Sequence, residues 1–364
     1  MANKHMPDNI NDYVISATSS VTAVGGNAVQ TCAAARANII GVSEHPVYRC
    51  KPLHPDEEKP LPLYCCRVPF INETQEGPER LLQLAVPALR EAVANAKLTV
   101  DMLAFGKLFV ALPEPDNTMA SWGLEQGFCP SLCQRVGIYP IQSRVKFGGH
   151  TSVFELLADA FKALEQDDCE FCIVGGVDSF LFTHRLTELD KNWFLRSKKN
   201  IDGFIPGEAA SFIVIEKSHT AEGRGAHALA RIDGLGVSNE PNTATSGRKS
   251  SGVGLTNAIH QASANRGHQF KTVYSDLNGE SYRAFEWGLA QVRAMDYLNP
   301  AFKLLHPAES YGDVGTATGA LLLTLATHDL QPKEHYPYTP KSVMLFSASH
   351  HGGTRVAASL SSIG

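Results

Sequence analysis

The sequence predicts an α/β fold built from two similar halves. Three observations support this prediction: strand-like runs alternate with helical ones, the strand-like runs are continuously apolar, and the same order of elements occurs twice along the chain. Continuously apolar strands are typical of sheets whose two faces are both covered by helices. The repetition is one of pattern rather than of residue identity, and it indicates the duplication of one α/β unit.

The first predicted half, residues 12–216, opens with a strand and continues with two helix–strand units. In front of its second helix, Gly148 and Gly149 allow a tight turn that presents His150 at the helix N-terminus. A turn of this kind is one way in which a fold displays a reactive side chain. The predicted elements are strands at 12–21, 107–113, 171–177 and 211–216, and helices at 78–96 and about 150–166.

The second predicted half, residues 228–361, repeats this order, and its first strand lies near Ile232. Its further predicted elements are a helix at 254–266, a strand at 272–277, a helix that follows residues 311–320, and strands at 342–349 and 355–361. Because the two halves are alike, we expect loops at corresponding strand ends to face one another. Polar residues on those loops would then meet in one central site.

The loops at these strand ends carry several residues that can take part in chemistry. They are His150, Asn278, Glu280, Asp313, His350 and His351. A local role is the simpler explanation for each of them alone: Asn278 with Gly279 is a turn dipeptide, and Asp313 can cap a helix. The functional interpretation depends on all of them falling on equivalent loops.

The composition excludes several classes of function. A chain of 364 residues that is 43% hydrophobic and 19% charged is ordinary for a globular protein. Its net charge of -5 leaves no basic excess for binding nucleic acid. No apolar run approaches the roughly 20 residues that cross a bilayer, and the first residues contain no hydrophobic signal-peptide core. We therefore expect a cytoplasmic protein with no membrane span and no nucleic-acid partner.

The eight cysteines predict neither a disulfide framework nor a metal site. Cys169 and Cys172 form a C-x-x-C, but the apolar residues that follow place them on a buried strand. Cys129 and Cys133 are spaced to share one face of a helix. A metal site would need further ligands at close spacing, and none is evident. We expect reduced, structural cysteines, with no metal and no cofactor.

Five segments also resemble, in the same order, segments of the β-ketoacyl synthases of the thiolase superfamily. The resemblance covers nearly the whole chain. It implies a duplicated thiolase-like fold layered α/β/α/β/α, and acyl transfer from thioesters in fatty-acid or polyketide biosynthesis. The five segments are "LADAFKALEQDDCEFCIVGGVDSFL", "DGFIPGEAASFIVIEK", "RGAHALARIDGLGVSNE", "GDVGTATGALLL" and "SASHHGGTRVAASL".

The catalytic positions of that family carry different residues here. The nucleophilic cysteine of its D-T-A-C-S-S motif aligns with His150, and its two catalytic histidines align with Asn278 and Asp313. The phenylalanine before its final G-G-T aligns with His351. Claisen condensation needs a thiolate that accepts the acyl group and two imidazoles that help decarboxylation and stabilise the enolate. Ordinary condensing activity is therefore not expected.

Three hypotheses follow from this substitution. The first is a non-condensing partner or binding protein, by analogy with the chain-length-factor subunits that resemble ketosynthases but lack the cysteine. The second is an enzyme of altered chemistry, acting by thioester hydrolysis, decarboxylation or acyl transfer, in which Asp313 orients His150 as a general base and Asn278 donates a hydrogen bond. The third is a condensing enzyme that uses Cys129 or Cys133 instead.

The resemblance also implies partners. Members of the family pair through strands of the N-terminal half, so we expect a homodimer, or a heterodimer with a thiolase-fold relative. An acyl carrier protein or acyl-CoA would supply the acyl group. Residues 127–145 have no clear counterpart in the family, and they fall in the region that usually forms the dimer contact and the acyl pocket.

Overall fold

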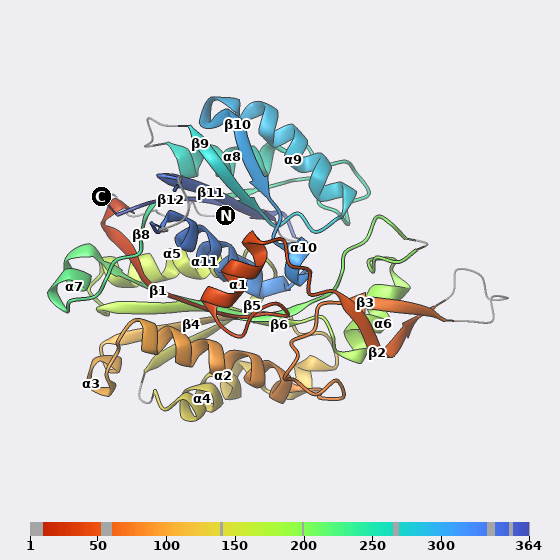
Figure 1. Ribbon diagram of the computed structural model, residues 1–364, viewed down its shortest axis with the longest axis horizontal. Coiled ribbons are helices and arrows are strands. Elements are labelled where there is room, and N and C mark those ends of the chain that lie inside the picture. The colour runs from red at the N-terminus through yellow and green to blue at the C-terminus, as the bar shows by residue number, and fades with distance from the viewer. Residues whose placement is uncertain are drawn as a thin grey trace.

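The computed structural model describes residues 10–51, 60–138, 141–198, 200–264, 269–332, 339–348 and 352–363. Helices and strands alternate within these ranges, as the sequence predicts for an α/β protein (Figure 1). None of the helices in these ranges is both long enough and apolar enough to cross a membrane.

The first part of the chain contains every element that the sequence predicts there and several that it does not. The strand β5 was missed because it is a polar edge strand rather than an apolar run. The elements are β1 (Tyr13–Val21), α1 (Ala28–Arg36), β2 (Ser43–Cys50), β3 (Leu61–Cys65), α2 (Pro78–Asn95), α3 (Val100–Leu103), β4 (Gly106–Pro113), α4 (Leu124–Val136), β5 (Gln142–Gly148), α5 (Ser152–Glu165), β6 (Phe171–Ser179), α6 (Thr183–Lys191) and β7 (Glu208–Lys217).

The second part begins its sheet near Ile232, as predicted, and adds α9 and β10 to the predicted set. Its elements are α7 (Ser218–Gly223), β8 (Ala230–Asn239), α8 (Val253–Ser263), β9 (Phe270–Ser275), α9 (Ser281–Arg293), β10 (Leu298–Leu305), α10 (Ala308–Tyr311), α11 (Thr318–Leu330), β11 (Ser342–Ala348) and β12 (Thr354–Ser361). Short 3-10 helices lie at η1 (Ile10–Asp12), η2 (Met119–Trp122), η3 (Met295–Tyr297) and η4 (Gly315–Ala317).

The segment 127–145, for which the resemblance offers no clear counterpart, contains most of α4 and the start of β5 among its described residues. One prediction needs correction. Cys169 does not lie on a buried strand, because β6 begins only at Phe171 and Cys169 sits half-buried in the turn before it. Cys172 does lie on that strand.

The main sheet runs in the order β10-β9-β11-β12-β8-β1-β7-β6-β4-β5. The strands on the two sides of the β8–β1 contact correspond one to one: β8 to β1, β12 to β7, β11 to β6, β9 to β4 and β10 to β5. The pairing directions correspond as well: β4 is parallel to β5 and β6, as β9 is to β10 and β11, while β7 and β12 are each antiparallel to both neighbours. This correspondence supports the predicted halves at residues 12–216 and 228–361, whose bounds stay a prediction.

The helices divide the molecule into five layers. α5 and α11 contact each other and lie between the two parts of the sheet (Figure 1). α2 and α4 cover the outer face of the first part, and α8 and α9 cover the outer face of the second. The layer order is therefore α/β/α/β/α.

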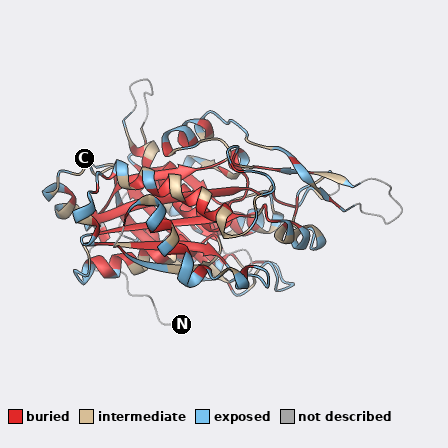
Figure 2. Ribbon diagram, turned by 90° about the horizontal axis from the view of Figure 1, so that it is seen from below, coloured by how far each residue is buried: buried red, intermediate tan, exposed pale blue. Residues whose placement is uncertain are grey.

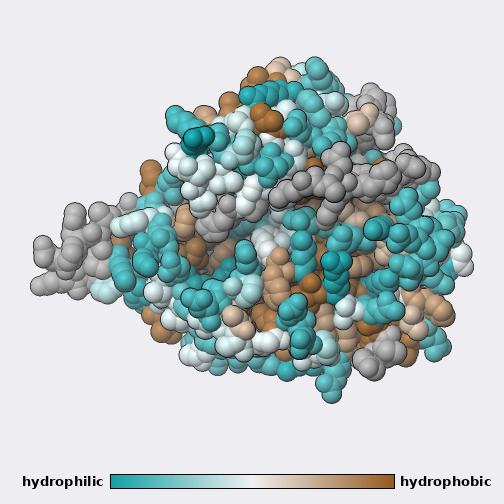
Figure 3. Space-filling model, turned by 180° about the vertical axis from the view of Figure 1, so that it is seen from behind, coloured by the Kyte–Doolittle hydropathy of each residue, from teal (hydrophilic) through white to brown (hydrophobic). Residues whose placement is uncertain are grey.

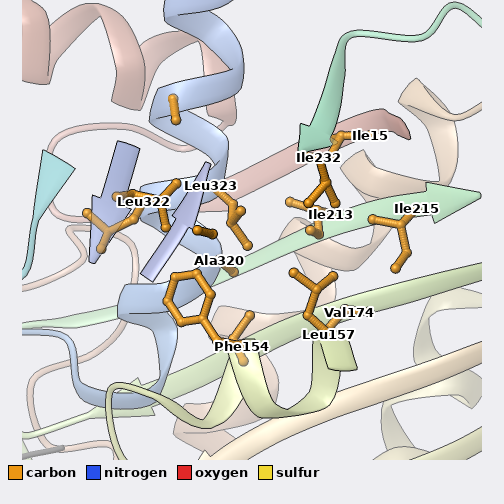
Figure 4. Close-up of a cluster of buried hydrophobic side chains, with 14 of the residues drawn as sticks. Ile15, Phe154, Leu157, Val174, Ile213, Ile215, Ile232, Ala320, Leu322 and Leu323 are labelled. Atoms are coloured by element: carbon orange, nitrogen blue, oxygen red, sulfur yellow. The ribbon is translucent and has the colours of Figure 1, made fainter. Parts of the chain in front are cut away.

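The largest core cluster fills the middle layer. Phe154 and Leu157 of α5 lie against Leu323 of α11 and against Ile213 and Ile232 from the sheet (Figure 4). Figure 2 shows the same distribution for the whole chain, with buried residues on the strands and the central helices and exposed residues on the outer helices and loops. Burial of each such large apolar side chain stabilises the folded state by about 1.5–3 kcal/mol. This packing holds the two parts of the sheet together, and with them the loops that form the candidate site.

Candidate active site

His150 lies where the sequence predicts, at the start of a buried helix. β5 ends at Gly148, a turn follows, and α5 begins at Ser152. The amide of Ser152 donates to the carbonyl of Gly149 at 3.0 Å and closes this turn. A Cβ atom on Gly148 would lie 2.2 Å from Ser152 Oγ, so a larger residue there requires the Ser152 side chain to rotate.

Asp313 is held through its backbone by a segment far away in the sequence. Its amide donates to the carbonyl of Ile205 at 2.8 Å, and its carbonyl accepts from the amide of Gly207 at 2.7 Å. A Cβ atom on residue 207 would lie 2.4 Å from the carbonyl oxygen of Tyr311, which explains why the "IPGE" segment has a glycine there. Asp313 therefore has a fixed position before any contact of its side chain is considered.

The side chains of His150, Asp313 and Asn278 form one hydrogen-bonded row. His150 Nε2 lies 2.7 Å from Asp313 Oδ1, and Asn278 Nδ2 donates to Asp313 Oδ2 at 2.7 Å. The amide of Gly315 also donates to Asp313 Oδ1, at 2.9 Å. His150 and Asp313 are only 3% and 4% exposed. Because an ionised carboxylate can accept but not donate, we assign a hydrogen to Nε2 of His150.

A buried arginine holds the far end of this row. Asn278 Nδ2 also donates to Glu280 Oε2 at 2.9 Å, and Arg283 Nε donates to the same oxygen at 3.1 Å. Arg283 Nη1 donates to Asp276 Oδ2 at 2.6 Å and to the carbonyl of Ala348 at 3.0 Å. Arg283 therefore ties the start of α9 to the ends of β9 and β11 and fixes the loop that carries Asn278.

Asp313 and Arg283 remain ionised at neutral pH. Burial alone would raise the pKa of the Asp313 carboxyl, but the charge of a protonated His150, the hydrogen bond between them and the charge of Arg283 hold that pKa well below its usual range. Burial alone would lower the pKa of Arg283, but the carboxylates of Asp276, Glu280 and Asp313 raise it. Asp313 is thus a hydrogen-bond acceptor only.

His150 and Asp313 line a cavity of about 590 Å³, a size that suits a small-molecule ligand. Nδ1 of His150 is buried and has no hydrogen-bond partner in the part of the chain that the structure describes. The cavity wall mixes apolar side chains with ionisable ones. The apolar residues are Phe147, Phe180, Leu189 and Phe204, and the ionisable ones, besides His150 and Asp313, are Glu114, Asp116, Lys146, Glu155, Asp178, Arg185 and Glu188.

The predicted convergence on His150 is only partly present. Asn278 reaches His150 through Asp313, and it lines a separate cavity of about 250 Å³ together with Arg196 and His306. His351, the fourth predicted site residue, lies outside the described residues, as does His350. The structure therefore places His150 and Asp313 at one cavity and Asn278 behind them.

An ion pair in the cavity wall was not predicted. Arg185 Nη1 donates to Asp178 Oδ1 at 2.5 Å, and the guanidinium carbon lies 4.3 Å from the centre of the Phe180 ring. Asp178 Oδ2 accepts from the amide of Thr316 at 3.0 Å. A Cβ atom on Gly176 would lie 2.2 Å from the carbonyl oxygen of Thr316, so this glycine permits the approach. One feature of the sequence could have indicated this ion pair: Asp178 is a carboxylate near the end of a strand that is mostly apolar.

No cysteine lines the 590 Å³ cavity within the described ranges. Cys129 and Cys133 lie on α4, in an outer layer, where burial raises the pKa of their thiols to about 12 and about 11. Thiols with such pKa values are not thiolates at neutral pH and make poor nucleophiles. The geometry gives no support to the hypothesis that either of them replaces the missing catalytic cysteine.

Comparison with known proteins gives sequence relatives for about half of the chain. No family model matches it. It is 27% identical over 236 residues to 3-oxoacyl-[acyl-carrier-protein] synthase 2 of Staphylococcus aureus, which is 56% of this chain and 58% of that protein. The same enzyme from strain COL matches at 27% identity over 57% of its length. The chain therefore spans little more than half the length of the curated relatives it matches.

Similarity to solved structures extends over nearly the whole chain. The ishigamide ketosynthase/chain length factor has a TM-score of 0.75 at 16% identity, covering 97% of this chain and 99% of that one. A type II polyketide synthase acyl-carrier protein in complex with its hexaketide-bound ketosynthase gives 0.78 at 12% identity, with coverages of 97% and 99%. A β-ketoacyl synthase from Burkholderia phymatum STM815 gives 0.71 at 15% identity, with coverages of 97% and 100%. The predicted thiolase-like fold is confirmed.

Proposed function

We propose that this chain, a thiolase-fold relative of the 3-oxoacyl-[acyl-carrier-protein] synthases, binds acyl thioesters without condensing them and pairs with a condensing protein of the same fold. One observation carries the proposal: the residue that the resemblance aligns with the nucleophilic cysteine, His150, is an imidazole, and no thiol lines the cavity among the described residues. Condensation requires a stored acyl-enzyme, and an acyl-imidazole is hydrolysed too readily to store the acyl group.

The two other catalytic positions support the same proposal. The enolate that forms during condensation needs hydrogen-bond donors at its oxygen. Asp313 is ionised and cannot donate. The amide of Asn278 can donate, but it is already directed to Asp313 and Glu280 at 2.7 and 2.9 Å and faces a different cavity. The site therefore lacks both groups that would replace the missing imidazoles.

The cavity itself remains suited to an acyl group. Phe147, Phe180 and Phe204 give it an apolar wall next to His150. Transfer of an acyl chain from water to such a wall is favourable, at about 0.8 kcal/mol for each buried CH₂ group. Loss of the nucleophile thus leaves a binding site, which is what a non-condensing partner needs.

An uncovered sheet edge supports pairing with another protein. Among the residues that the structure describes, β5 is the last strand on its side of the sheet and pairs with β4 alone, so its other edge has no strand partner. Its first three residues, Gln142, Ser143 and Arg144, are exposed. Figure 3 shows apolar side chains exposed on the lower part of the rear face, at the height of the first half in Figure 1. Edges of this kind are usually covered in natural proteins.

The decisive experiment mixes the protein with acyl and malonyl thioesters of coenzyme A and of an acyl carrier protein and follows all species by mass spectrometry. We expect non-covalent binding of the acyl thioester, no stable acyl-enzyme and no β-ketoacyl product. His150→Cys is the matched variant: it restores the thiol, yet should not condense because Asn278 and Asp313 still replace both imidazoles. A β-ketoacyl product from the wild-type protein would refute the proposal.

Pairing has its own test. Sedimentation at micromolar concentration should show a dimer, or a monomer that becomes a heterodimer when a condensing ketosynthase from the same cell is added. A monomer under both conditions would contradict the predicted pairing. It would not bear on the binding of acyl thioesters, which the first experiment tests.

One observation favours a second function, thioester hydrolysis or decarboxylation. Asp313 orients the Nε2 hydrogen of His150, and Nδ1 is buried without a partner in the described part of the chain. In a neutral imidazole Nδ1 can take a proton from water as the water oxygen attacks the thioester carbonyl carbon. The same proton can then pass to the departing thiolate, so that a free acid and a thiol are released.

The second function is separated from the first by His150→Ala. If the protein is a hydrolase, the variant should lose release of free thiol while it still binds the thioester. Asp313→Asn should reduce the rate because the imidazole loses its orienting charge. Equal thiol release by wild type and His150→Ala would exclude His150 as the base.

A further inference from the structure

Cys169 and Cys172 form a close pair that neither the fold nor the proposed function requires. Their Sγ atoms lie 3.4 Å apart. Cys172 lies fully buried on β6, where its thiol also donates to the carbonyl of Ala160 at 3.8 Å. Cys169 is only half-buried, in the turn between α5 and β6. One thiol is therefore accessible from the surface, and the other lies directly behind it.

The backbone holds the two thiols at this spacing. On one side of Cys169 the amide of Asp168 donates to the carbonyl of Ala163 at 3.0 Å, and on the other the amide of Glu170 donates to the carbonyl of Phe105 at 2.8 Å. A disulfide needs a sulfur–sulfur distance of about 2.05 Å. The sulfur atoms must therefore approach by about 1.4 Å from 3.4 Å.

The surroundings assign different roles to the two thiols. The hydrogen bond with Cys172 lowers the pKa of Cys169, and the charge of Lys107 lowers it further, against the effect of burial. The same hydrogen bond and burial raise the pKa of Cys172 well above its usual value. Cys169 is thus suited to attack, and Cys172 to react second. Beside them, Lys107 and Lys162 line a surface cavity of about 330 Å³ that includes Asp168, the neighbour of Cys169.

We propose that Cys169 and Cys172 are a redox-active dithiol that a small anionic disulfide of the glutathione type converts into an intramolecular disulfide. The Cys169 thiolate attacks one sulfur of the small disulfide, a mixed disulfide forms, and one small thiolate leaves. Cys172 loses its proton and attacks Cys169 Sγ, which releases the second thiolate. The protein loses two electrons and two protons, and the small disulfide is reduced to two thiols.

The test uses the full-length, folded protein and oxidised glutathione as the probe. After incubation, remaining thiols are alkylated and the protein is digested with trypsin. Cleavage after Lys162 and Arg185 gives one peptide that contains both cysteines and no other. We expect this peptide to become lighter by two hydrogen atoms and to resist alkylation, while the other six of the eight cysteines stay alkylated.

Two variants separate the steps. Cys172→Ser should stop at a stable mixed disulfide between glutathione and Cys169. Cys169→Ser should leave Cys172 unmodified because it is buried. Cys129 and Cys133 are the internal control, since burial raises the pKa of both thiols, to about 12 and about 11. Circular dichroism confirms that each variant is folded.

The proposal is overturned if the wild-type peptide remains fully alkylated at a glutathione potential that oxidises a free dithiol. It is also overturned if bridging appears only in denaturant, or if Cys129 and Cys133 oxidise at the same potential. None of these outcomes depends on whether the 590 Å³ cavity binds an acyl thioester.

Discussion

Replacing Asp313 with alanine is expected to lower the free energy of unfolding by about 2–6 kcal/mol, the cost of leaving two buried hydrogen-bond donors without an acceptor. The carboxylate accepts hydrogen bonds from His150, Asn278 and Gly315 at 2.7, 2.7 and 2.9 Å. Asn278 keeps Glu280 as an acceptor, so two donors lose theirs. Two buried donors at about 1–3 kcal/mol each give this total.

Urea unfolding followed by circular dichroism measures this change. Glu44→Ala is the matched control, because it removes a carboxylate that pairs with Arg49 at 3.1 Å but is 49% exposed. We expect no measurable change for the control. If Asp313→Ala unfolds within about 1 kcal/mol of wild type, Asp313 is not the centre of a buried charged network and the reasoning fails.

Three further predictions concern stability. The pKa of Asp313 is lower in the folded protein, so its ionisation stabilises the fold fully above the unfolded-state pKa of about 3.9 and less as the pH falls below that value. The difference in unfolding free energy between wild type and Asp313→Asn should therefore narrow below about pH 4. A difference that narrows mainly between about pH 5 and pH 4 would contradict this. Arg80→Met should lower the free energy of unfolding in urea by about 3–5 kcal/mol, because it leaves the buried carboxylate of Glu208 without its partner; the two side chains are 1% and 0% exposed and 2.7 Å apart. Adding Glu208→Leu should recover part of this loss. No recovery would mean that the unpaired charge of Glu208 is not the cause. Gly176→Ala should lower the melting temperature, since its Cβ would lie 2.2 Å from a backbone oxygen of η4, and an unchanged melting temperature would contradict this packing.

Local patterns in the sequence predicted the elements whose physics is local. The apolar runs of β6 and β7 are buried along almost their whole length, so hydropathy alone identifies them, whereas β1 is equally buried but carries Ser and Thr side chains. The two glycines before His150 and the apolar face of α5 similarly placed that residue at a helix start. The edge strand β5 escaped prediction because an exposed strand has no apolar run to mark it. α4 was predicted only as a helix face shared by Cys129 and Cys133, because Pro130 interrupts its helical pattern.

Ordered motifs in the sequence also predict which residues stand at the catalytic positions of the family that the chain resembles. Alignment on ordered motifs assigned His150, Asn278 and Asp313 to the positions of the thiolase-superfamily triad, and the thiolase-like fold that the same motifs implied is confirmed by solved structures. Whether these residues bind, catalyse or only stabilise one another stays a prediction.

Contacts between distant segments were decided only by the tertiary structure. His150 and Asp313 are 163 residues apart, and their hydrogen bond exists because α5 and α11 pack in one layer and because segment 205–207 holds the backbone of Asp313. The same holds for Arg283, which no pattern singled out, and for the side chain of Asn278, which turns toward a second cavity. Periodicity and turn residues are set by neighbours in the chain, so the amino-acid sequence by itself shows them. Side-chain partners depend on how whole layers of helices and strands pack, and only the tertiary structure shows that packing.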